Sequence, residues 1–406
     1  MTIPQHRAAR TMKITLIAAT VLLLTVGARQ SLGLFVLPVI TTTGVSIVAM
    51  SLALAVGQFV WGAAQPIFGA IADKQGAFRV VVVGALLMAS GSALTTQVNS
   101  PTGLLLTLGL LSAVGAAAGS FSIMIGAVSK WVPPERRSLA AGIINAGGSL
   151  GQFVFAPLMQ FIISASGWVT AMLTLAASAL LTIPLAWQLR SREENSSLAS
   201  VATSVTLTQQ LRTAARDPSY LYLHAGFFTC GFHIAFLVTH LPADLQLCGL
   251  PAKVAANSLG LIGLCNVAGS LAAGWWGQRY RMKNILAVIY ASRAAMIGMY
   301  LWMPKTALNI YLFACGLGLT WLATVPPTSG LVGKLFGTRY LATLFGLTLL
   351  SHQIGGFLGA WLGGLALAKL GSYDSMWYAD VALALAAALI NLPIKETRPL
   401  AYPAEV

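Results

Sequence analysis

SKWVPPERRSLAAGIINAGGSLGQF, residues 129–153, matches GKLFGTRYLATLFGLTLLSHQIGGF, residues 333–357, when the chain is shifted by 204 residues. The shift places Lys130 on Lys334, Gly142 on Gly346, and Gly151 on Gly355. It also overlays GARQSLGLFVLP, residues 27–38, on GFHIAFLVTHLP, residues 231–242, and thereby pairs Arg29 with His233. One constant offset over two distant segments predicts two parallel internal repeats.

The composition is far too apolar for a soluble domain. Of 406 residues, 57% are hydrophobic and 8% are charged, whereas soluble domains carry about 25% charged residues. Charged and Gly/Pro-rich breaks leave about twelve apolar stretches, starting near residues 14, 46, 79, 103, 138, 168, 219, 252, 284, 307, 340 and 373. Each is close to the ~20 residues that cross a bilayer as a helix. We therefore predict an all-α membrane protein with twelve transmembrane helices in two six-helix, pseudo-symmetric bundles.

A single long polar stretch divides the chain. It begins at Arg190 and reads RSREENSSLASVATSVTLTQQLRTAARDPS. The predicted organisation is an N-terminal six-helix bundle over residues 1–189, a cytoplasmic linker over 190–218, and a C-terminal six-helix bundle over 219–406. Within the linker, TLTQQLRTAAR is expected to form a short interfacial helix.

The basic residues are distributed unevenly between the two sides of the predicted bundles. Of the 24 Lys and Arg residues, Lys253, Lys305 and Lys369 fall on one side, Arg29 and Arg293 fall within spans, and the remaining nineteen fall on the side of the termini. This asymmetry predicts cytoplasmic termini in a multi-pass protein of the bacterial inner membrane. It explains the net charge of +14 by orientation among membrane lipids, without a nucleic-acid partner.

The remaining composition gives no sign of a cofactor or metal. The four cysteines are scattered through apolar segments, which is typical of buried free thiols. Cys230 and His233 are three residues apart, but two helical neighbours do not make a metal site. The first apolar segment follows basic residues, yet it is too long for a signal peptide and has no small-residue cleavage site, so we expect a retained helix.

The loop after the second span carries a recognisable motif. GAIADKQGAFR, residues 69–79, resembles the signature of the major facilitator superfamily. The resemblance implies that Asp73 and nearby basic residues such as Arg79 form a charge cluster that holds an inner gate. The second copy, GWWGQRYRMK from Gly274, has Gln278 at the acidic position, so the C-terminal gate is expected to be built differently.

A narrower resemblance lies at the start of the fifth span. RRSLAAGIINAGGSLG, residues 136–151, is similar to a signature of the monocarboxylate transporter family, although Ile144 replaces an alanine. The chain lacks that family's acid-led motif in span 1, and Ser270 stands where the family has an arginine in span 8. The closer resemblance is to bacterial members of the monocarboxylate transporter-like branch. It implies transport of small monocarboxylates together with a proton.

Arg29 and His233 are the first candidates for a central site. A charge at mid-bilayer depth costs roughly 2.5–3.5 kcal/mol on insertion scales, so it normally faces a polar cavity or a partner. In the superfamily that the chain resembles, spans 1, 4, 7 and 10 line the path, and Arg29 belongs to span 1. Its guanidinium suits a carboxylate, but pairing with helix-end carbonyls or an internal acid is the alternative. His233, its repeat counterpart, is a candidate for substrate binding and proton coupling, or a packing histidine.

Other polar residues within spans complete the set of candidates. The expected substrate-binding residues also include His352, Asn145, Gln152 and Trp321, with His352 a second proton-coupling candidate. Each of the two amides could instead join helices. Trp321 precedes Pro326 and Pro327, which should kink span 10. His240 is a candidate for gating or for packing, and Arg293 is predicted to form a buried structural ion pair with Asp380.

These features predict a secondary transporter of a small organic anion, expected to act as a monomer by alternating access and proton symport. There is no nucleotide-binding loop and no nucleophile–base cluster, which argues against an ATP-driven pump and an enzyme. A receptor would need a soluble module that the linker is too short to hold. The competing hypothesis is a proton-coupled exporter of amphipathic compounds, in which transport would not depend on Arg29.

Overall fold

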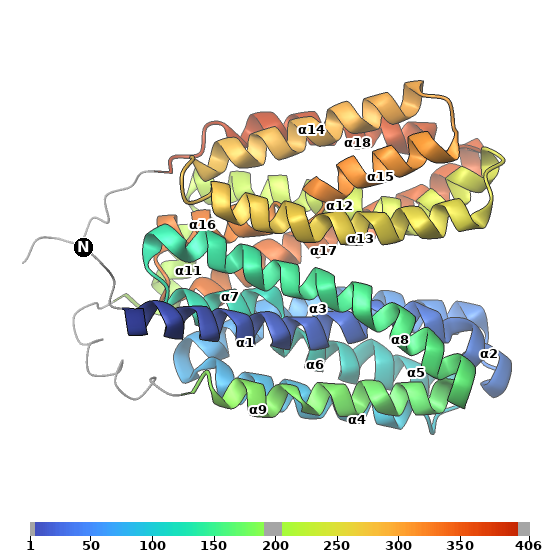
Figure 1. The fold of residues 1–406 in the computed structure, drawn as a ribbon, viewed down its shortest axis with the longest axis horizontal. Coiled ribbons are helices and arrows are strands. Elements are labelled where there is room, and N and C mark those ends of the chain that lie inside the picture. Colours follow the sequence, from blue (N-terminus) through green and yellow to red (C-terminus); the bar gives the residue numbers. More distant parts are fainter. Residues whose placement is uncertain (1–4, 191–204, 397–406) are drawn as a thin grey trace, which may run out of the picture.

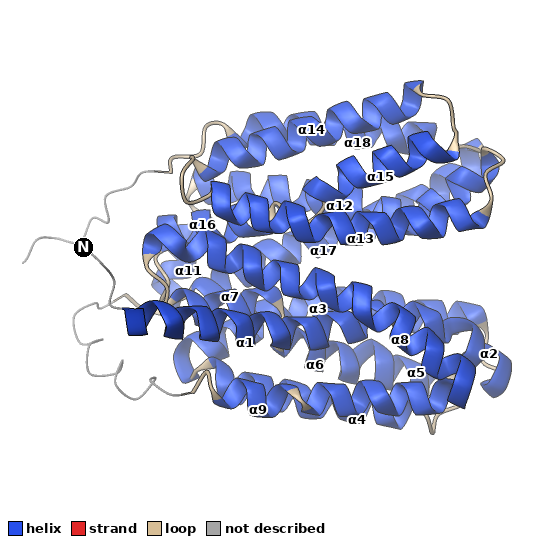
Figure 2. Ribbon diagram, viewed as in Figure 1, coloured by secondary structure: helices blue, strands red, loops and turns tan. Residues whose placement is uncertain are grey.

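The computed structural model describes residues 5–190 and 205–396, and every regular element in these ranges is a helix (Figure 2). Ten stretches in these ranges are long and apolar enough to cross a membrane. One of them, Pro134–Trp187, turns at Gly167, whose φ of 82° is not helical, and so supplies two crossings. The helix Asp374–Asn391 carries two aspartates and completes the twelve predicted helices.

The N-terminal half contains long helices interrupted by short ones. Its elements are α1 (Gln5–Gln30), η1 (Leu32–Phe35), α2 (Val36–Thr43), α3 (Ile47–Gln75), α4 (Ala77–Thr95), α5 (Pro101–Leu104), η2 (Leu105–Ser112), α6 (Ala113–Ala118), α7 (Phe121–Ser129), η3 (Pro134–Arg136), α8 (Arg137–Leu180) and α9 (Thr182–Trp187).

The C-terminal half follows a short amphipathic helix, α11 (Leu207–Ala215), which confirms the helix expected in TLTQQLRTAAR. Thr206 caps α11, accepting a hydrogen bond from the amide of Gln209, whose side chain accepts one from the amide of Thr206. The half comprises α12 (Pro218–Leu247), α13 (Ala252–Trp276), α14 (Met282–Trp302), α15 (Ala307–Thr320), α16 (Val325–Phe336), α17 (Leu341–Leu370) and α18 (Asp374–Asn391).

The two halves lie side by side with their helices roughly parallel to one long axis (Figure 1). They meet at the end of the molecule where α1 begins and α11 lies, which we call the linker end, and they diverge toward the opposite, far end (Figure 1). Helix α8 packs against α13 across the boundary, and α3 packs against α17. These pairs form the α8–α13 seam and the α3–α17 seam.

Small residues explain how helices approach closely within each half. Gly151 of α8 lies against the carbonyl of Leu23 on α1, and Gly355 of α17 lies against the carbonyl of Phe228 on α12, so a Cβ at either glycine would overlap backbone. Their positions differ by 204 residues. Tight packing of this kind is a main source of helix association in lipid, and its recurrence agrees with the internal repeat.

Two membrane-crossing segments are broken near their middle, at positions that correspond in the repeat. Helix α6 ends at Ala118 and α7 begins at Phe121, while α15 ends at Thr320 and α16 begins at Val325. The expected kink of span 10 is confirmed, because α16 has proline at its start. The break at Gly119 and Ser120 is a finding of the structure that the sequence analysis did not predict.

Candidate functional site

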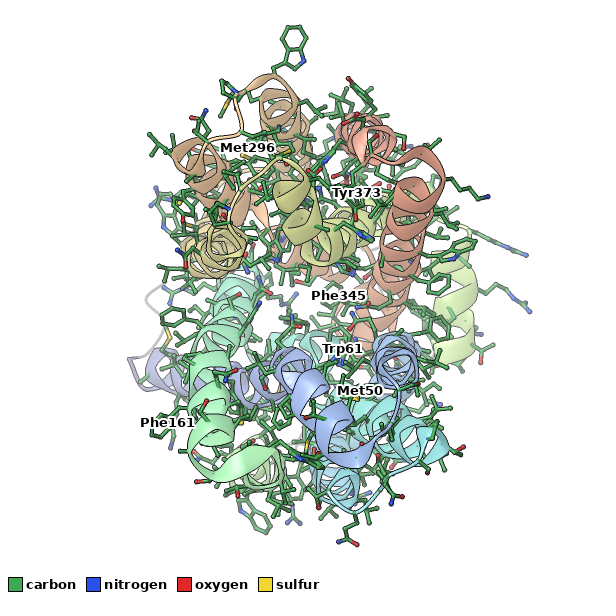
Figure 3. The ribbon with its side chains drawn as sticks, turned by 90° about the vertical axis from the view of Figure 1, so that its right-hand side faces the viewer. Met50, Trp61, Phe161, Met296, Phe345 and Tyr373 are labelled. Atoms are coloured by element: carbon green, nitrogen blue, oxygen red, sulfur yellow. The ribbon has the colours of Figure 1, made fainter. Side chains whose placement is uncertain are left out.

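Arg29 lies near the end of α1, half-buried beside α3. Its guanidinium carbon is 4.8 Å from the ring centroid of Trp61, and its Nη2 donates a hydrogen bond to Gln58 Oε1. No acidic side chain of the described residues lies within ion-pair distance of it. Viewed from the far end, Trp61 lies near the middle of the molecule (Figure 3). The structure therefore offers a cation held by an amide and an aromatic face, without a carboxylate partner.

The amide of Gln58 continues this contact to the other half. Gln58 Nε2 donates to Gln353 Oε1 at 2.8 Å, and Gln353 is buried where Gly62 leaves room for its side chain. Gln353 is on α17, twelve residues from its start, about 18 Å along the helix at 1.5 Å per residue. The hydrogen-bonded series Arg29, Gln58, Gln353 thus crosses the α3–α17 seam at mid-depth.

The α8–α13 seam carries a second polar series. Asn145 Nδ2 donates to Ser270 Oγ at 2.7 Å and to the carbonyl of Leu322 at 3.0 Å. Asn266 Nδ2 donates to Ser149 Oγ at 2.7 Å, while its Oδ1 accepts from the amide of Leu322 at 2.9 Å. Asn145 therefore joins the halves, which is the interhelical role considered for it, and the two asparagines hold the unwound backbone between α15 and α16.

The two seams are related by the same 204-residue shift. It places Ser149 on Gln353 and Gly62 on Asn266. On the α8–α13 seam the amide side chain is Asn266 of α13 and the small residue is Ser149 of α8. On the α3–α17 seam the amide side chain is Gln353 of α17 and the small residue is Gly62 of α3. Each seam thus fills the same space with one large and one small side chain, contributed by opposite repeats.

The break in the N-terminal half is also lined by polar groups. Thr25 Oγ1 donates to the carbonyl of Gly119 at 2.8 Å. Ser122 Oγ donates to Gln65 Oε1 at 3.1 Å and lies 3.1 Å from Ser120 Oγ. Unwound backbone in the middle of spans is tolerated only where protein or a cavity surrounds it, and transporters use such breaks at their binding sites.

His233 does not face Arg29, contrary to the sequence-based expectation. Its side chain is 1% exposed, and its Nδ1 lies 2.6 Å from Oδ2 of Asp380, which is 0% exposed. The ring of Trp321 is 5.9 Å away, between centroids. Asp380 is on α18 at the periphery of the half, so the repeat relation that pairs His233 with Arg29 does not extend to their surroundings.

The predicted ion pair between Arg293 and Asp380 is wrong. Arg293 is 1% exposed, and its guanidinium donates to the carbonyls of Thr320 and Trp321 and to Cys230 Sγ, the last at 3.3 Å. The break after α15 leaves those carbonyls without helical donors, and an arginine fork can satisfy both. Asp380 instead pairs with His233, so neither Arg293 nor Asp380 has the partner that was predicted for it.

The other predicted substrate residues differ in their placement. His352 is buried against Phe227, with ring centroids 5.1 Å apart, and thus faces α12 within its own half rather than the seam. Trp321 is buried at the helix break, with its ring toward His233. Gln152 is half-buried on α8, and no side-chain hydrogen bond to it is found among the described residues.

Asp73 joins the halves at the linker end. Its carboxylate accepts from the amides of Ala342 and Thr343, at 3.4 and 2.8 Å, and from Thr343 Oγ1 at 2.7 Å. These amides belong to the first turn of α17, where a negative charge is favourable. Lys130 Nζ lies 3.9 Å from the same carboxylate. An acid from one half therefore caps a helix of the other.

Arg79 is not part of this contact, which corrects the expectation for it, and the contacts of His240 agree with the packing role considered for it. Arg79 is exposed and lines a cavity with Lys13 and Arg190, and no ion pair with Asp73 is found among the described residues. His240 is bonded within the C-terminal half, with Nδ1 3.2 Å from Tyr373 Oη and Nε2 2.8 Å from the carbonyl of Ala360. Its position is at the far end of that half and not at a seam.

The sequence analysis missed residues that the seams depend on. Gln58 and Asn266 form hydrogen bonds across the boundary, where only helix packing brings them. Trp61 and Gln65 contact Arg29 and Ser122 of their own half, and the sequence analysis missed them as well. One signal was present: the shift that pairs Ser149 with Gln353 also pairs Gly62 with Asn266. Following polar residues through that shift would have identified both seams.

Comparison with known sequences gives a consistent result. The family model described as Major Facilitator Superfamily matches residues 18–360. The monocarboxylate transporter 13 of Rattus norvegicus is 28% identical over 347 residues, covering 84% of this chain and 78% of that protein. The oxalate:formate antiporter of Oxalobacter formigenes is 24% identical over 356 residues, covering 85% and 82%.

Solved structures show the same fold at low sequence identity. The E. coli fucose:proton symporter superposes with a TM-score of 0.71 at 15% identity, covering 94% of this chain and 98% of that one. The proton:xylose symporter superposes with a TM-score of 0.73 at 13% identity, covering 94% and 95%. The predicted all-α, two-bundle fold is thereby confirmed.

Proposed function

Because the chain belongs to the Major Facilitator Superfamily, we propose that it carries a small organic anion, a monocarboxylate, and that Arg29 is the anion anchor. Its family and its relatives are transporters rather than enzymes. We further propose that the linker end is cytoplasmic, as the distribution of basic residues favours, so that the arrangement in this structure is closed toward the cytoplasm.

The observation that carries the proposal is the guanidinium of Arg29, which has no carboxylate partner among the described residues. A neutral amide of Gln58 and the ring of Trp61 hold it in place. Neither neutralises its charge, and both are weaker partners than a carboxylate. A carboxylate ligand would supply the missing charge and exploit the planar fork of the guanidinium.

The seam geometry supports release by alternating access. Gln58 is in the N-terminal half and Gln353 in the C-terminal half, and the two are directly bonded. An anion on Arg29 that also bonds Gln353 would bridge the halves. Separation of the halves at the linker end would then break one set of contacts and lower affinity.

The substrate class rests on the site and on the relatives together. A lone arginine with neutral amides suits a single small carboxylate better than a multiply charged anion. The relatives are named for monocarboxylates and for oxalate and formate. A monocarboxylate accordingly fits both the charge of the site and the relatives, and proton symport would make its uptake electroneutral.

For proton coupling we propose the buried pair of His233 and Asp380. The imidazole and the carboxylate lie 2.6 Å apart and are almost fully buried, so movement of α12 relative to α18 would separate them in a site away from water. Trp321, whose backbone forms part of the break between α15 and α16, contacts His233. This contact links protonation of the pair to the unwound segment held by Asn145 and Asn266.

Binding of labelled acetate, lactate, pyruvate and formate to the purified chain tests the anchor. We expect Arg29→Gln to weaken binding by about tenfold to one hundredfold, the effect of losing a charged hydrogen bond, and Arg29→Lys to weaken it less. Arg279→Gln is a matched control, because Arg279 is exposed at the linker end and stacks on Trp275. Undiminished binding to folded Arg29→Gln would reject the anchor.

The competing function, export of amphipathic compounds, makes the opposite prediction for Arg29. It requires transport of a bulky apolar substrate that Arg29→Gln leaves unchanged. Uptake of labelled carboxylates into proteoliposomes, with and without a pH gradient, separates the two, because carboxylate uptake that responds to the gradient is expected only for the symporter.

A further inference from the structure

A cavity of about 930 Å³ opens at the linker end of the N-terminal half. It lies among the beginnings of α1 and α4 and the ends of α3 and α9. Its lining includes the cations of Arg10, Lys13, Arg79 and Arg190, and none of its described lining residues is acidic. The proposed transport mechanism uses none of these residues.

Three of the cations carry the inference. Lys13 comes from α1, Arg79 from the first turn of α4, and Arg190 from the residues that follow α9. None of the three has an ion pair with a described acidic residue. Like charges repel when they share a cavity, and this arrangement concentrates them without a compensating carboxylate in the lining. Such a cavity favours a ligand that brings negative charge.

The cavity is polar at its rim and apolar at its floor. Ile14 and Ile17 of α1 are buried and line the inner part. Phe78 and Trp187 meet edge to face at 5.4 Å, and the guanidinium of Arg190 lies over both rings, 5.7 and 4.9 Å from their centroids. Trp187 is 58% exposed, as is typical of tryptophan at the surface of a bilayer.

We propose that this cavity binds the headgroup of an anionic phospholipid from the adjacent leaflet. The phosphate and its negative charge would lie among Lys13, Arg79 and Arg190. The glycerol and upper acyl chain would lie on Ile14, Ile17 and the ring of Trp187. A free phosphate would not contact the apolar floor, whereas a phospholipid would contact both the cations and the floor.

The position of the cavity gives the lipid a route to the inter-half contact. Gln75 and Arg79, which line the cavity, flank the turn between α3 and α4. Asp73, which caps α17 of the other half, is two residues before Gln75. A lipid that fixes this turn would stabilise the arrangement in which the linker end is closed.

The test uses the purified full chain in detergent, titrated with dioleoyl phosphatidylglycerol or dioleoyl phosphatidylcholine. Native mass spectrometry counts the retained lipids. We expect phosphatidylglycerol to be retained in preference by the natural chain, and the preference to fall on the order of tenfold in Lys13→Gln/Arg79→Gln, because two cations near the phosphate are lost. The matched control, Arg279→Gln/Arg281→Gln, removes two exposed cations at the same end of the other half and should keep the preference.

Three results would overturn the proposal. One is equal retention of the two lipids by the natural chain, and another is an unchanged preference in Lys13→Gln/Arg79→Gln. The third is displacement of phosphatidylglycerol by millimolar inorganic phosphate, which would indicate a site for a soluble anion. The linker acids Glu193 and Glu194 are the other candidate occupants. If they fill the cavity, Glu193→Gln/Glu194→Gln will create a lipid preference that the natural chain lacks.

Discussion

At the scale of single residues, the partners of the buried charged groups in this protein cannot be predicted from their separation in the sequence. Arg293 satisfies carbonyls at a helix break, and Asp380 takes His233. Arg29 alone of these groups is half-buried and contacts neutral partners. The same residue type therefore satisfies a helix break in span 9 and, as we propose, binds an anion in span 1.

Asp380→Asn is predicted to separate substrate binding from proton coupling. The amide keeps the shape of the side chain but cannot carry the charge that pairs with protonated His233. We expect carboxylate binding to change by less than about threefold and accumulation driven by a pH gradient to be lost. Uptake into proteoliposomes with and without the gradient measures this, and Asp374→Asn, at the exposed start of α18, is the control. Full gradient-driven uptake by Asp380→Asn would contradict the coupling role.

Arg293→Met is predicted to destabilise the fold by about 2–5 kcal/mol, because two carbonyls and Cys230 lose their donor in a buried site. Thermal unfolding in detergent measures the change. The double variant Arg293→Met/Asp380→Asn distinguishes this cause from an ion pair. An ion pair would make the double variant more stable than Arg293→Met, whereas capping of the helix break predicts no recovery.

At the scale of elements, helix breaks and small residues define where the halves can touch. The segments α6–α7 and α15–α16 are both unwound at equivalent positions, and the second is clamped by Asn145 and Asn266 at the backbone of Leu322. Proline at the start of α16 removes helical donors there. Asn145 of α8 supplies a donor to the carbonyl of Leu322, and Asn266 of α13 accepts from its amide, so the break is stabilised only when the helices are packed.

Asn266→Ala is predicted to loosen this break. The amide of Leu322 loses its acceptor and Ser149 loses its donor, a cost of about 1–3 kcal/mol if the site stays buried. Hydrogen exchange over residues 320–326 should then accelerate by roughly tenfold to one hundredfold. Asn257→Ala is the control, since Asn257 lies on the same helix but bonds only Tyr311 near its exposed end. Exchange no faster than in this control would show that the clamp does not hold the break.

At the scale of the whole molecule, the halves are held together at the linker end and diverge at the far end (Figure 1). Asp73 supplies charged contacts to the first turn of α17, and close backbone packing of Gly142 on Gly274 accompanies it on the other seam. A change of state must break both contacts together. We therefore predict that Asp73 biases an equilibrium between arrangements rather than stabilising either half by itself.

Asp73→Asn is predicted to favour the arrangement opened at the linker end. Loss of charge at the start of α17 should shift the equilibrium by about fivefold to thirtyfold, as expected for 1–2 kcal/mol. Hydrogen exchange should rise in residues 138–142 and 341–346 together, while turnover falls and carboxylate binding persists. Glu135→Gln is the control, because Glu135 is exposed in the short helix η3 at the same end. Unchanged exchange in both segments would contradict the role of Asp73.

The sequence by itself determined the helical membrane fold, the two repeats and the family. These follow from local quantities: apolar stretches of bilayer length, a constant offset of 204 residues, and the motif around Asp73. It also predicted the kink of span 10, and it supplied Arg29 as the candidate anchor. Each of these depends on the residue and its near neighbours in the chain, which is why no packing information was needed.

Only the tertiary structure decided which buried groups meet. The repeat places His233 opposite Arg29 in sequence, yet α18 brings Asp380 to His233, and the break after α15 draws Arg293 away. The partners of Gln353 and Asn145 come from the other half, 295 and 125 residues away in the chain. Side-chain direction around a helix changes by 100° per residue. A small rotation of a helix about its axis thus changes which residue a side chain contacts, while the hydropathy, the length and the motifs of that helix stay the same.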